Sequence, residues 1–410
     1  MSDDSYTEVT TESWWSRLKE SLGTALLGLI LFLVAFVLLF WNEGRAVHRA
    51  KILAEGAGIV ISIDANQVDA VNEGKLVHLS EEATTDKVLT DAMFGVVAPK
   101  ALKLRRVVEM YQWQEERQSD KQDKLGGGTE TETSYTYTKT WKDSVIDSSH
   151  FKQPKGHNNP SRMKVNGETF IAKPVKLGAF SLSASLVENL NNYQHLPMTD
   201  ENMEQVPQEV RARFGETTEV VSLSEQPQML HISYGNYYVG QDPLQPQLGD
   251  LRIKFEVVLP ATISVVAKQV GSSLTTYTTQ TGGSLELFEY GTIKAQDMFK
   301  HEVQSNTMLS WILRFVGFII MFFGLSLIFN VLKTLADVLP FLGDIVGFIG
   351  TLVSFVIAAT LSLITIAIAW IVYRPVLGIT LTVIAVGLLY FLKYAKPQPA
   401  VRKTSRRRSA

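Results

Sequence analysis

Long apolar stretches separated by polar ones dominate the pattern along this chain. Four of them contain no charged residue: Leu22–Trp41, Phe315–Leu332, Ile345–Tyr373 and Pro375–Leu392. Because an α-helix rises about 1.5 Å per residue, each is long enough to cross a hydrocarbon core of roughly 30 Å. Tryptophan or tyrosine lies near the ends of several runs, as is typical of the membrane interface. The pattern therefore predicts an integral membrane protein and excludes a soluble cytosolic enzyme.

The basic residues predict how the chain is oriented. Residues 393–410 carry seven lysines and arginines and no acid, so we expect this end to stay in the cytoplasm. Counting back through four spans places both termini there. The predicted segments are a cytoplasmic N-terminal segment (1–21), transmembrane helices 22–41, 311–332, 349–373 and 375–394, an extracytoplasmic domain (42–310), a cytoplasmic or interfacial loop (333–348) and a basic cytoplasmic tail (395–410). Residues 340–350 belong either to the interface or to an overlong third span.

Residues 42–310 alternate between apolar and polar positions in many places, which is typical of β-strands. The alternation in Leu102–Trp113 and Thr133–Trp141 predicts a long hairpin. Residues 180–191 and 292–307 favour helices, and the second is expected to continue into the second span. The predicted fold class is thus α+β: a four-helix integral membrane protein with one large extracytoplasmic mixed α+β domain inserted between its first and second transmembrane helices.

The residue types and motifs of the chain limit the kinds of active site and metal site that it can form. The chain has no cysteine, which excludes disulfides, thiolate metal sites and cysteine nucleophiles. No common catalytic motif is present apart from the short pattern Ser161-x-x-Lys164, whose companion motif is missing. Four histidines have spacings that match no metal-ligand pattern: His78, His150, His157 and His195. We therefore predict no enzyme activity, no catalytic residue, no cofactor and no metal.

Several residues stand out by their context. Arg105 and Arg106 interrupt an apolar strand and should point to opposite faces; they either pair with Glu109 or another acid across the sheet or bind an anion or lipid headgroup. His157 and Asn159 lie in a polar turn, and Arg374 lies between two spans. These five are the candidate interaction or lipid-facing residues. Two further sets are candidates for helix packing, within the chain or between copies, and for contact of the tail with anionic lipid; they are Ser354, Ala358, Thr360 and Thr365, and Arg402, Lys403, Arg406, Arg407 and Arg408.

Several ordered segments resemble the transmembrane protein 43 (LUMA) family. They include NEGRA at Asn42–Ala46, NEGKLVH at Asn72–His78, KLRRVVEMYQWQE at Lys103–Glu115, GHNNPSRM at Gly156–Met163 and WIVYRP at Trp370–Pro375. The resemblance implies a four-span protein with one large luminal domain, which self-associates and takes part in envelope organisation. A cysteine-free chain with an arginine-rich tail is typical of a prokaryotic member. The membrane would be the inner cell membrane in a bacterium, or the endoplasmic reticulum and inner nuclear membrane in a eukaryote.

The leading hypothesis is a non-enzymatic multi-pass membrane scaffold that self-associates and organises membrane or envelope protein complexes through its extracytoplasmic domain. Its expected partners are the lipid bilayer, further copies of the chain and other membrane proteins, with no nucleic acid. The alternative is a lipid-binding or small-molecule transport protein. Transport is disfavoured because the four runs carry no ionisable group.

Overall fold

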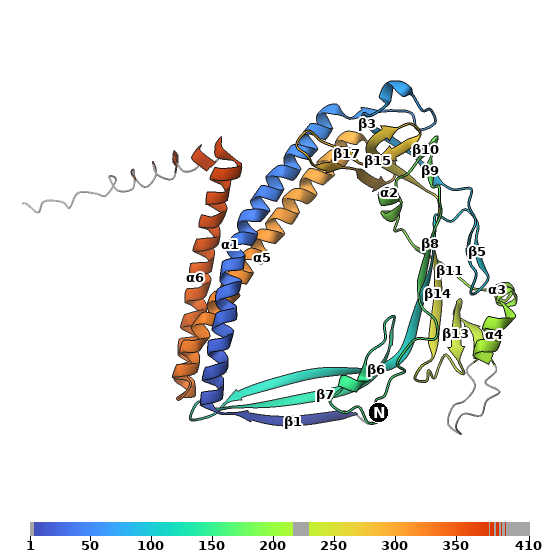
Figure 1. Ribbon diagram of the computed structural model, residues 1–410. Coiled ribbons are helices and arrows are strands. Elements are labelled where there is room, and N and C mark those ends of the chain that lie inside the picture. The colour runs from blue at the N-terminus through green and yellow to red at the C-terminus, as the bar shows by residue number, and fades with distance from the viewer. Residues whose placement is uncertain are drawn as a thin grey trace, which may run out of the picture. The chain divides into compact units, whose positions relative to one another are not determined.

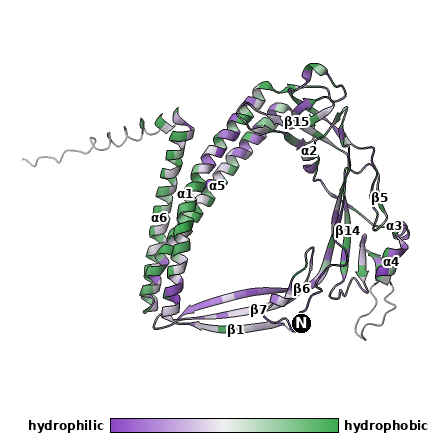
Figure 2. Cartoon of the chain, in the orientation of Figure 1, coloured by the Kyte–Doolittle hydropathy of each residue, from purple (hydrophilic) through white to green (hydrophobic). Residues whose placement is uncertain are grey.

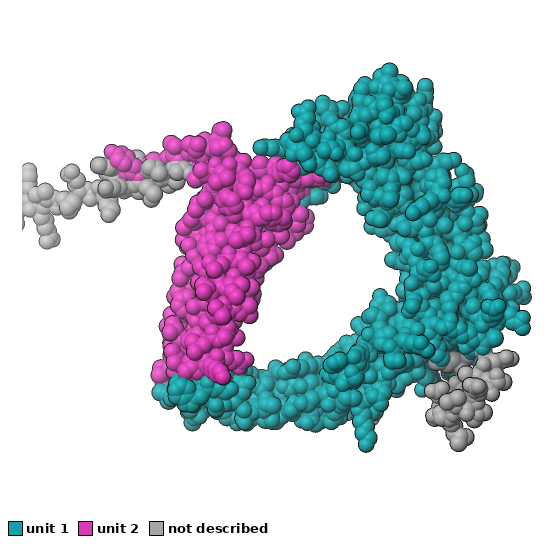
Figure 3. All heavy atoms as spheres, in the orientation of Figure 1, with its two compact units in different colours: residues 1–17, 51–305, 337–340 teal, residues 18–50, 306–336, 341–410 magenta. Residues whose placement is uncertain are grey.

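The computed structural model describes residues 4–215 and 229–376, together with residues 378–380, 383, 384, 387 and 390. The chain divides into two compact units, coloured separately in Figure 3. Unit 1 comprises residues 1–17, 51–305 and 337–340, and unit 2 comprises residues 18–50, 306–336 and 341–410.

Unit 2 is built on three long helices: α1 (Trp14–Ile59), α5 (Ala295–Ala336) and α6 (Pro340–Tyr373). Each is long and apolar enough to cross a membrane, and they are the three candidate spans among the described residues. Their apolar middles are visible in Figure 2. The predicted fourth span, residues 375–394, lies largely outside the described residues, and the basic tail lies entirely outside them.

The helices extend well beyond their apolar runs. Ser13 caps α1, its side chain accepting a hydrogen bond from the backbone of Ser16. The helix continues past Trp41 to Ile59 because no proline interrupts this segment. Pro340 occupies the first position of α6, where its missing N–H costs nothing. Residues 340–350 are thus helical and continuous with the third span.

Small residues allow α1 and α5 to approach closely. A Cβ atom built on Gly28 would lie 2.6 Å from the backbone oxygen of Gly324, and one built on Gly324 would lie 2.7 Å from that of Gly28. Such contacts replace the hydrophobic driving force that is missing between helices in lipid. The buried side chains beside this crossing are Ala35, Leu39, Met321, Leu325 and Ala358.

Unit 1 contains two main sheets. The first has eight strands (Figure 1). Its main path runs through β1 (Ser5–Glu12), β7 (Thr129–Lys142), β6 (Lys103–Asp123), β14 (Leu251–Val258), β13 (Asn236–Gly240) and β12 (Met229–Ser233), while β8 (Glu168–Ile171) pairs with β6 and β11 (Gln194–Leu196) with β14. All these pairings are antiparallel.

The predicted hairpin is confirmed as β6 and β7, and it is longer than expected. The strands pair from Met110 with Lys142 out to Asp123 with Thr129. Gly126 and Gly127 form the turn with φ of 90° and 80°, a backbone region that side chains disfavour.

Strand β1 extends this hairpin sideways, and the sequence did not predict it. Residues 5–12 pair with residues 129–136 of β7, although residues 1–21 were predicted as a separate segment across the membrane from residues 42–310. The sides of the membrane on which residues 1–21 and residues 42–310 lie stay a prediction.

The second sheet has seven strands and folds back on itself. Its path is β19 (Leu287–Tyr290), β15 (Ala261–Val270), β16 (Ser273–Thr275), β10 (Phe180–Ser181), β9 (Lys176–Leu177), β3 (Leu76–Thr84) and β2 (Ile61–Ser62). Strand β15 also pairs with β3, which connects the second strand of this path to the sixth. The remaining elements are two small hairpins, β4 (Leu89–Asp91) with β5 (Val96–Ala98) and β17 (Tyr277–Thr278) with β18 (Ser284–Leu285); the short helices α2 (Ala184–Glu188), α3 (Asp200–Gln205) and α4 (Gln208–Gly215); and 3-10 turns at Ala70–Asn72 and Ser148–His150.

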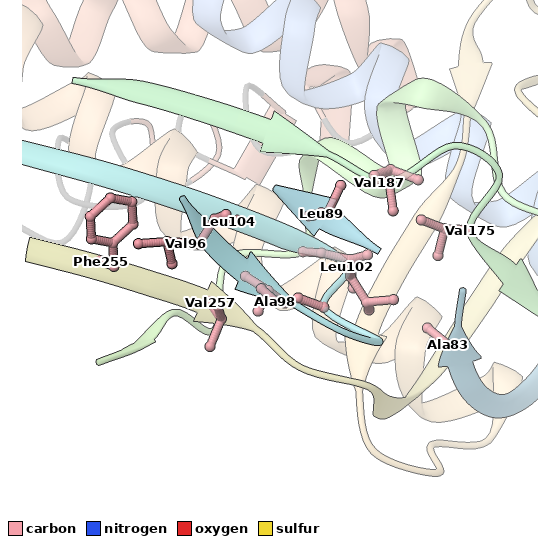
Figure 4. Packing of buried hydrophobic residues seen from close by; sticks show 14 of the residues in the cluster. Ala83, Leu89, Val96, Ala98, Leu102, Leu104, Val175, Val187, Phe255 and Val257 are labelled. Carbon is pink, nitrogen blue, oxygen red and sulfur yellow. The ribbon is translucent and has the colours of Figure 1, made fainter. Parts of the chain in front are cut away.

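The core of unit 1 lies under the β4–β5 hairpin, as Figure 4 shows. Leu104 of β6 and Phe255 of β14 are fully buried against it. Phe94, in the turn between β4 and β5, stacks on Tyr237 with ring centroids 5.3 Å apart. The alternating burial along β6 and β14 explains why these two strands were predictable from the sequence.

Candidate functional site: a buried polar junction between the membrane helices

A cluster of buried polar residues in unit 2 begins directly after the first apolar run. Asn42 and Glu43 have no exposed surface, although they stand one and two residues beyond Trp41. Because α1 does not break here, both side chains are carried on a rigid helix against α5 and α6. A buried carboxylate is expensive unless it is paired and fully hydrogen-bonded, so its surroundings decide what it does.

Glu43 accepts three hydrogen bonds from two other helices. Arg314 of α5 donates from Nε to Oε1 at 2.6 Å and from Nη2 to Oε2 at 2.9 Å. Trp370 of α6 donates from its indole Nε1 to Oε2 at 2.8 Å. The guanidinium also lies 4.7 Å from the ring centroid of Trp311 and 5.7 Å from that of Trp370. The carboxylate of Glu43 therefore joins α1 to α5 through a bidentate ion pair, a strong type of hydrogen-bonded contact, and joins α1 to α6 through the indole hydrogen bond.

A second set of hydrogen bonds joins α1 to α5 one turn away. Asn42 donates from Nδ2 to the backbone oxygen of Ser310 at 3.0 Å. Arg45 donates to Oδ1 of Asn306 and to Oγ of Ser310, both at 3.0 Å. Asn306 in turn donates to the backbone oxygen of Ala46 at 3.0 Å. The motif at residues 42–46 is thus used almost in full for contacts with α5.

Gly44, the remaining residue of this motif, makes room for α6. A Cβ atom there would lie 2.7 Å from Cζ of Tyr373. The Tyr373 ring also packs on Phe40, with centroids 5.2 Å apart. Trp370 and Tyr373 belong to the WIVYRP segment, so two separate motifs of the sequence meet at this junction.

The geometry of the junction fits a structural tie rather than catalysis. The carboxylate of Glu43 is occupied by three donors, and no nucleophile contacts it among the described residues. No group of three or more potential metal ligands occurs in the described part of the chain.

Arg105 and Arg106 are both paired with carboxylates. Arg105 donates to Glu256 on the neighbouring strand at 2.9 and 2.5 Å and lies 3.9 Å from the ring centroid of Tyr193. Arg106 is buried and binds Asp91, Glu168 and the backbone of Asn166. Glu109 pairs instead with Arg252 at 2.7 Å and Lys254 at 3.1 Å.

His157 and Asn159 hold loops to the β6–β7 hairpin. The buried His157 ring stacks on Tyr137 at 3.9 Å, and its nitrogens contact the backbone oxygen of Gln153 at 2.8 Å and Oδ2 of Asp4 at 2.9 Å. The side-chain amide of Asn159 bonds both the N–H and the carbonyl of Trp113, at 2.7 and 2.9 Å. The Asn159 amide thus makes the two backbone hydrogen bonds to Trp113 that a neighbouring strand would otherwise make.

Three of the four predicted helix-packing residues are buried and one is exposed. Ser354, Ala358 and Thr365 are buried on α6 within the chain, whereas Thr360 is exposed and donates to the backbone oxygen of Val356. Arg374 is half-buried just after α6, and its side chain makes no ion pair with a described residue. The five tail residues from Arg402 to Arg408 lie outside the described residues.

Sequence reasoning missed Glu43, Arg314 and Trp370 as a set. A signal was present, because Glu43 and Arg314 carry opposite charges and each stands beside an apolar run.

Comparison with known proteins gives a consistent result. The family model described as "Transmembrane protein 43" matches residues 110–375. Transmembrane protein 43 of Rattus norvegicus is 34% identical over 371 residues, covering 88% of this chain and 86% of the relative. The Homo sapiens protein is 35% identical with the same coverage, and the Drosophila melanogaster homolog is 32% identical over 361 residues, 86% of this chain and 90% of the relative. No solved structure matches significantly.

Proposed function

This chain belongs to the transmembrane protein 43 family, and from that premise we propose that it is a non-enzymatic multi-pass membrane scaffold. It self-associates and organises membrane or envelope protein complexes through the sheets of unit 1. The names of its relatives describe transmembrane proteins.

The observation that carries the proposal is the open edge of the first sheet. Strand β1 pairs with β7 on one side and is the last strand on the other. Its eight residues include no proline and no lysine, and its two charged residues, Glu8 and Glu12, pair with Lys152 and Lys121. An open strand edge is a template for pairing with another strand.

The register identifies which backbone groups are available. Tyr137 donates its N–H to the oxygen of Asp4, so the alternate residues of β1 that follow also bond β7. Ser5, Thr7, Val9 and Thr11 then direct their N–H and C=O groups away from β7. Two copies can therefore pair antiparallel through β1 around a two-fold axis and form one continuous sheet.

A proline at Val9 tests this interface. The side chain of Val9 is 58% exposed, so Val9→Pro removes one outward N–H while leaving the bonds to β7 in place. We expect Val9→Pro to weaken self-association of the full chain in lipid particles, and the matched variant Val9→Ala to leave it unchanged. An equal oligomer size for both variants would contradict pairing through β1.

A disulfide shows whether β1 stays in place in the proline variant. The hydroxyls of Thr7 and Ser134 lie 3.4 Å apart across β1 and β7, a spacing suited to a disulfide between cysteines at these positions. Its formation in the Val9→Pro background would show that loss of the oligomer comes from the outer edge and not from an unfolded strand.

A further inference from the structure

A cavity of about 430 Å³ lies between the C-terminal part of α5 and the N-terminal part of α6. It belongs wholly to unit 2, and its size falls within the range of small-molecule sites. The scaffold function does not require it. Its lining includes Phe323, Ser326, Asn330 and Lys333 of α5, and Asp344 and Thr351 of α6.

The polarity of the lining changes steadily along α5. Ser326, Asn330 and Lys333 are spaced i, i+4 and i+7, which places them on one face of the helix. Ser326 is separated from Lys333 by about 10 Å along the helix axis, at about 1.5 Å per residue. Phe323 precedes this face within the apolar run, and Lys333 directly follows the end of the run at Leu332. The cavity thus passes from an apolar end, through a hydroxyl and an amide, to a charged end.

Ser326 provides an independent indication of a ligand. Its hydroxyl oxygen is buried and has no hydrogen-bond partner among the described residues. A serine inside a helix usually donates to the backbone one turn earlier, and a buried hydroxyl without a partner costs about 1–3 kcal/mol. A carbonyl oxygen of a molecule in the cavity would satisfy it.

The charged end carries both signs. Lys333, near the C-terminal end of α5, and Asp344, near the N-terminal end of α6, line the same cavity. A group that complements both has a negative and a positive charge close together. A phospholipid matches this lining when its acyl chain, ester and phosphate follow one another along α5 and its ammonium lies beside Asp344 of α6.

We propose that this cavity binds one phospholipid with a primary ammonium headgroup, of the phosphatidylethanolamine class. Its phosphate contacts Lys333, its ammonium contacts Asp344, an ester carbonyl accepts a hydrogen bond from Ser326, and one acyl chain lies beside Phe323. A primary ammonium donates hydrogen bonds to a carboxylate, which a choline headgroup does not do. This binding adds a lipid preference to the membrane scaffold.

Native mass spectrometry of the full chain tests the proposal. The protein is reconstituted in nanodiscs of equal parts phosphatidylethanolamine, phosphatidylcholine and phosphatidylglycerol, and the lipid retained after release is identified. We expect one retained phosphatidylethanolamine, and a loss of retention of about tenfold or more in Lys333→Gln, because a charge-assisted hydrogen bond is lost. Asp344→Asn should reduce the preference for ethanolamine over choline headgroups. Lys300→Gln, at the exposed opposite end of α5, is the matched control.

A variant that fills the cavity separates binding from misfolding. A Cβ atom at Gly347 would lie 3.0 Å from Cδ of Lys333, so Gly347→Leu occupies space beside the lysine stem. It should abolish retention while leaving the unfolding temperature in detergent within a few degrees of the wild-type value. Equal retention of the three lipids by the wild type, or unchanged phosphatidylethanolamine retention in Lys333→Gln and Gly347→Leu, would overturn the proposal.

Discussion

Replacing Glu43 with leucine removes the acceptor that joins the three membrane helices. The change leaves the guanidinium of Arg314, whose side chain is 12% exposed, buried without its carboxylate. Breaking a buried ion pair on one side costs about 3–5 kcal/mol. Trp370 also loses the acceptor of its indole N–H, which adds about 1 kcal/mol. We therefore expect Glu43→Leu to lower the free energy of unfolding by several kcal/mol.

The double variant distinguishes the ion pair from a general loss of packing. Replacing both partners of a buried pair by apolar residues of similar size is often neutral, so Glu43→Leu with Arg314→Met should cost less than either single change. The assay is SDS-driven unfolding of the full chain in mixed micelles, followed by circular dichroism. A matched control is Lys124→Met in the exposed pair with Glu130, where we expect a loss of no more than about 1 kcal/mol. A cost below about 1 kcal/mol for Glu43→Leu, or single costs that simply add in the double variant, would refute the reasoning.

Three further predictions follow from other contacts. Gly28→Ala should destabilise the chain by about 1–3 kcal/mol through overpacking, because its new methyl group meets a backbone oxygen of α5. Gly23→Ala lies on the same helix with open space around it and should leave the stability unchanged. The same unfolding assay compares the two variants. Burial lowers the pKa of His78, so His78 takes up a proton in the unfolded chain first as the pH falls. The contribution of neutral His78 to stability is complete above about pH 6.5, the usual pKa of histidine, and is lost as the pH falls below that value. His78→Gln should therefore flatten the pH dependence of the free energy of unfolding. Cysteines at Thr7 and Ser134 should form an intrachain disulfide in an otherwise cysteine-free chain, detected as a mobility shift without reductant.

Each of these has an outcome that contradicts it. Equal stability of the two glycine variants would mean that α1 and α5 do not cross at Gly28. An unchanged pH dependence in His78→Gln would assign the loss of stability to other groups. Dimers linked by the cysteines, without the intrachain product, would show that β1 pairs with the hairpin of another copy.

The sequence predicted the elements whose residues carry their own periodicity. The three described membrane helices follow from apolar runs, and the hairpin of β6 and β7 follows from alternation that the structure reproduces as alternating burial in parts of both strands. Residues 180–191 were predicted as a helix, but they contain β10 and the short α2 instead. Residues 229–240 form two strands, β12 and β13, because Tyr234 and Gly235 adopt positive φ and reverse the chain between them.

The rest depends on contacts between distant residues, which one sequence does not display. Strand β1 contains a single strongly apolar residue, Val9, and is fixed by hydrogen bonds to residues more than a hundred positions away. The junction at Glu43 depends likewise on Arg314 and Trp370. The family resemblance identified both motifs that meet there, but only their spatial arrangement shows that they form one site.

The mass of the complex extracted directly into native lipid particles, without detergent, tests the central claim most directly. A scaffold that self-associates through β1 predicts one discrete multimer of the 45.7 kDa chain, which Val9→Pro reduces in size and Val9→Ala does not. A monomer in the wild type, at the concentration at which the chain occurs in its membrane, would contradict the claim.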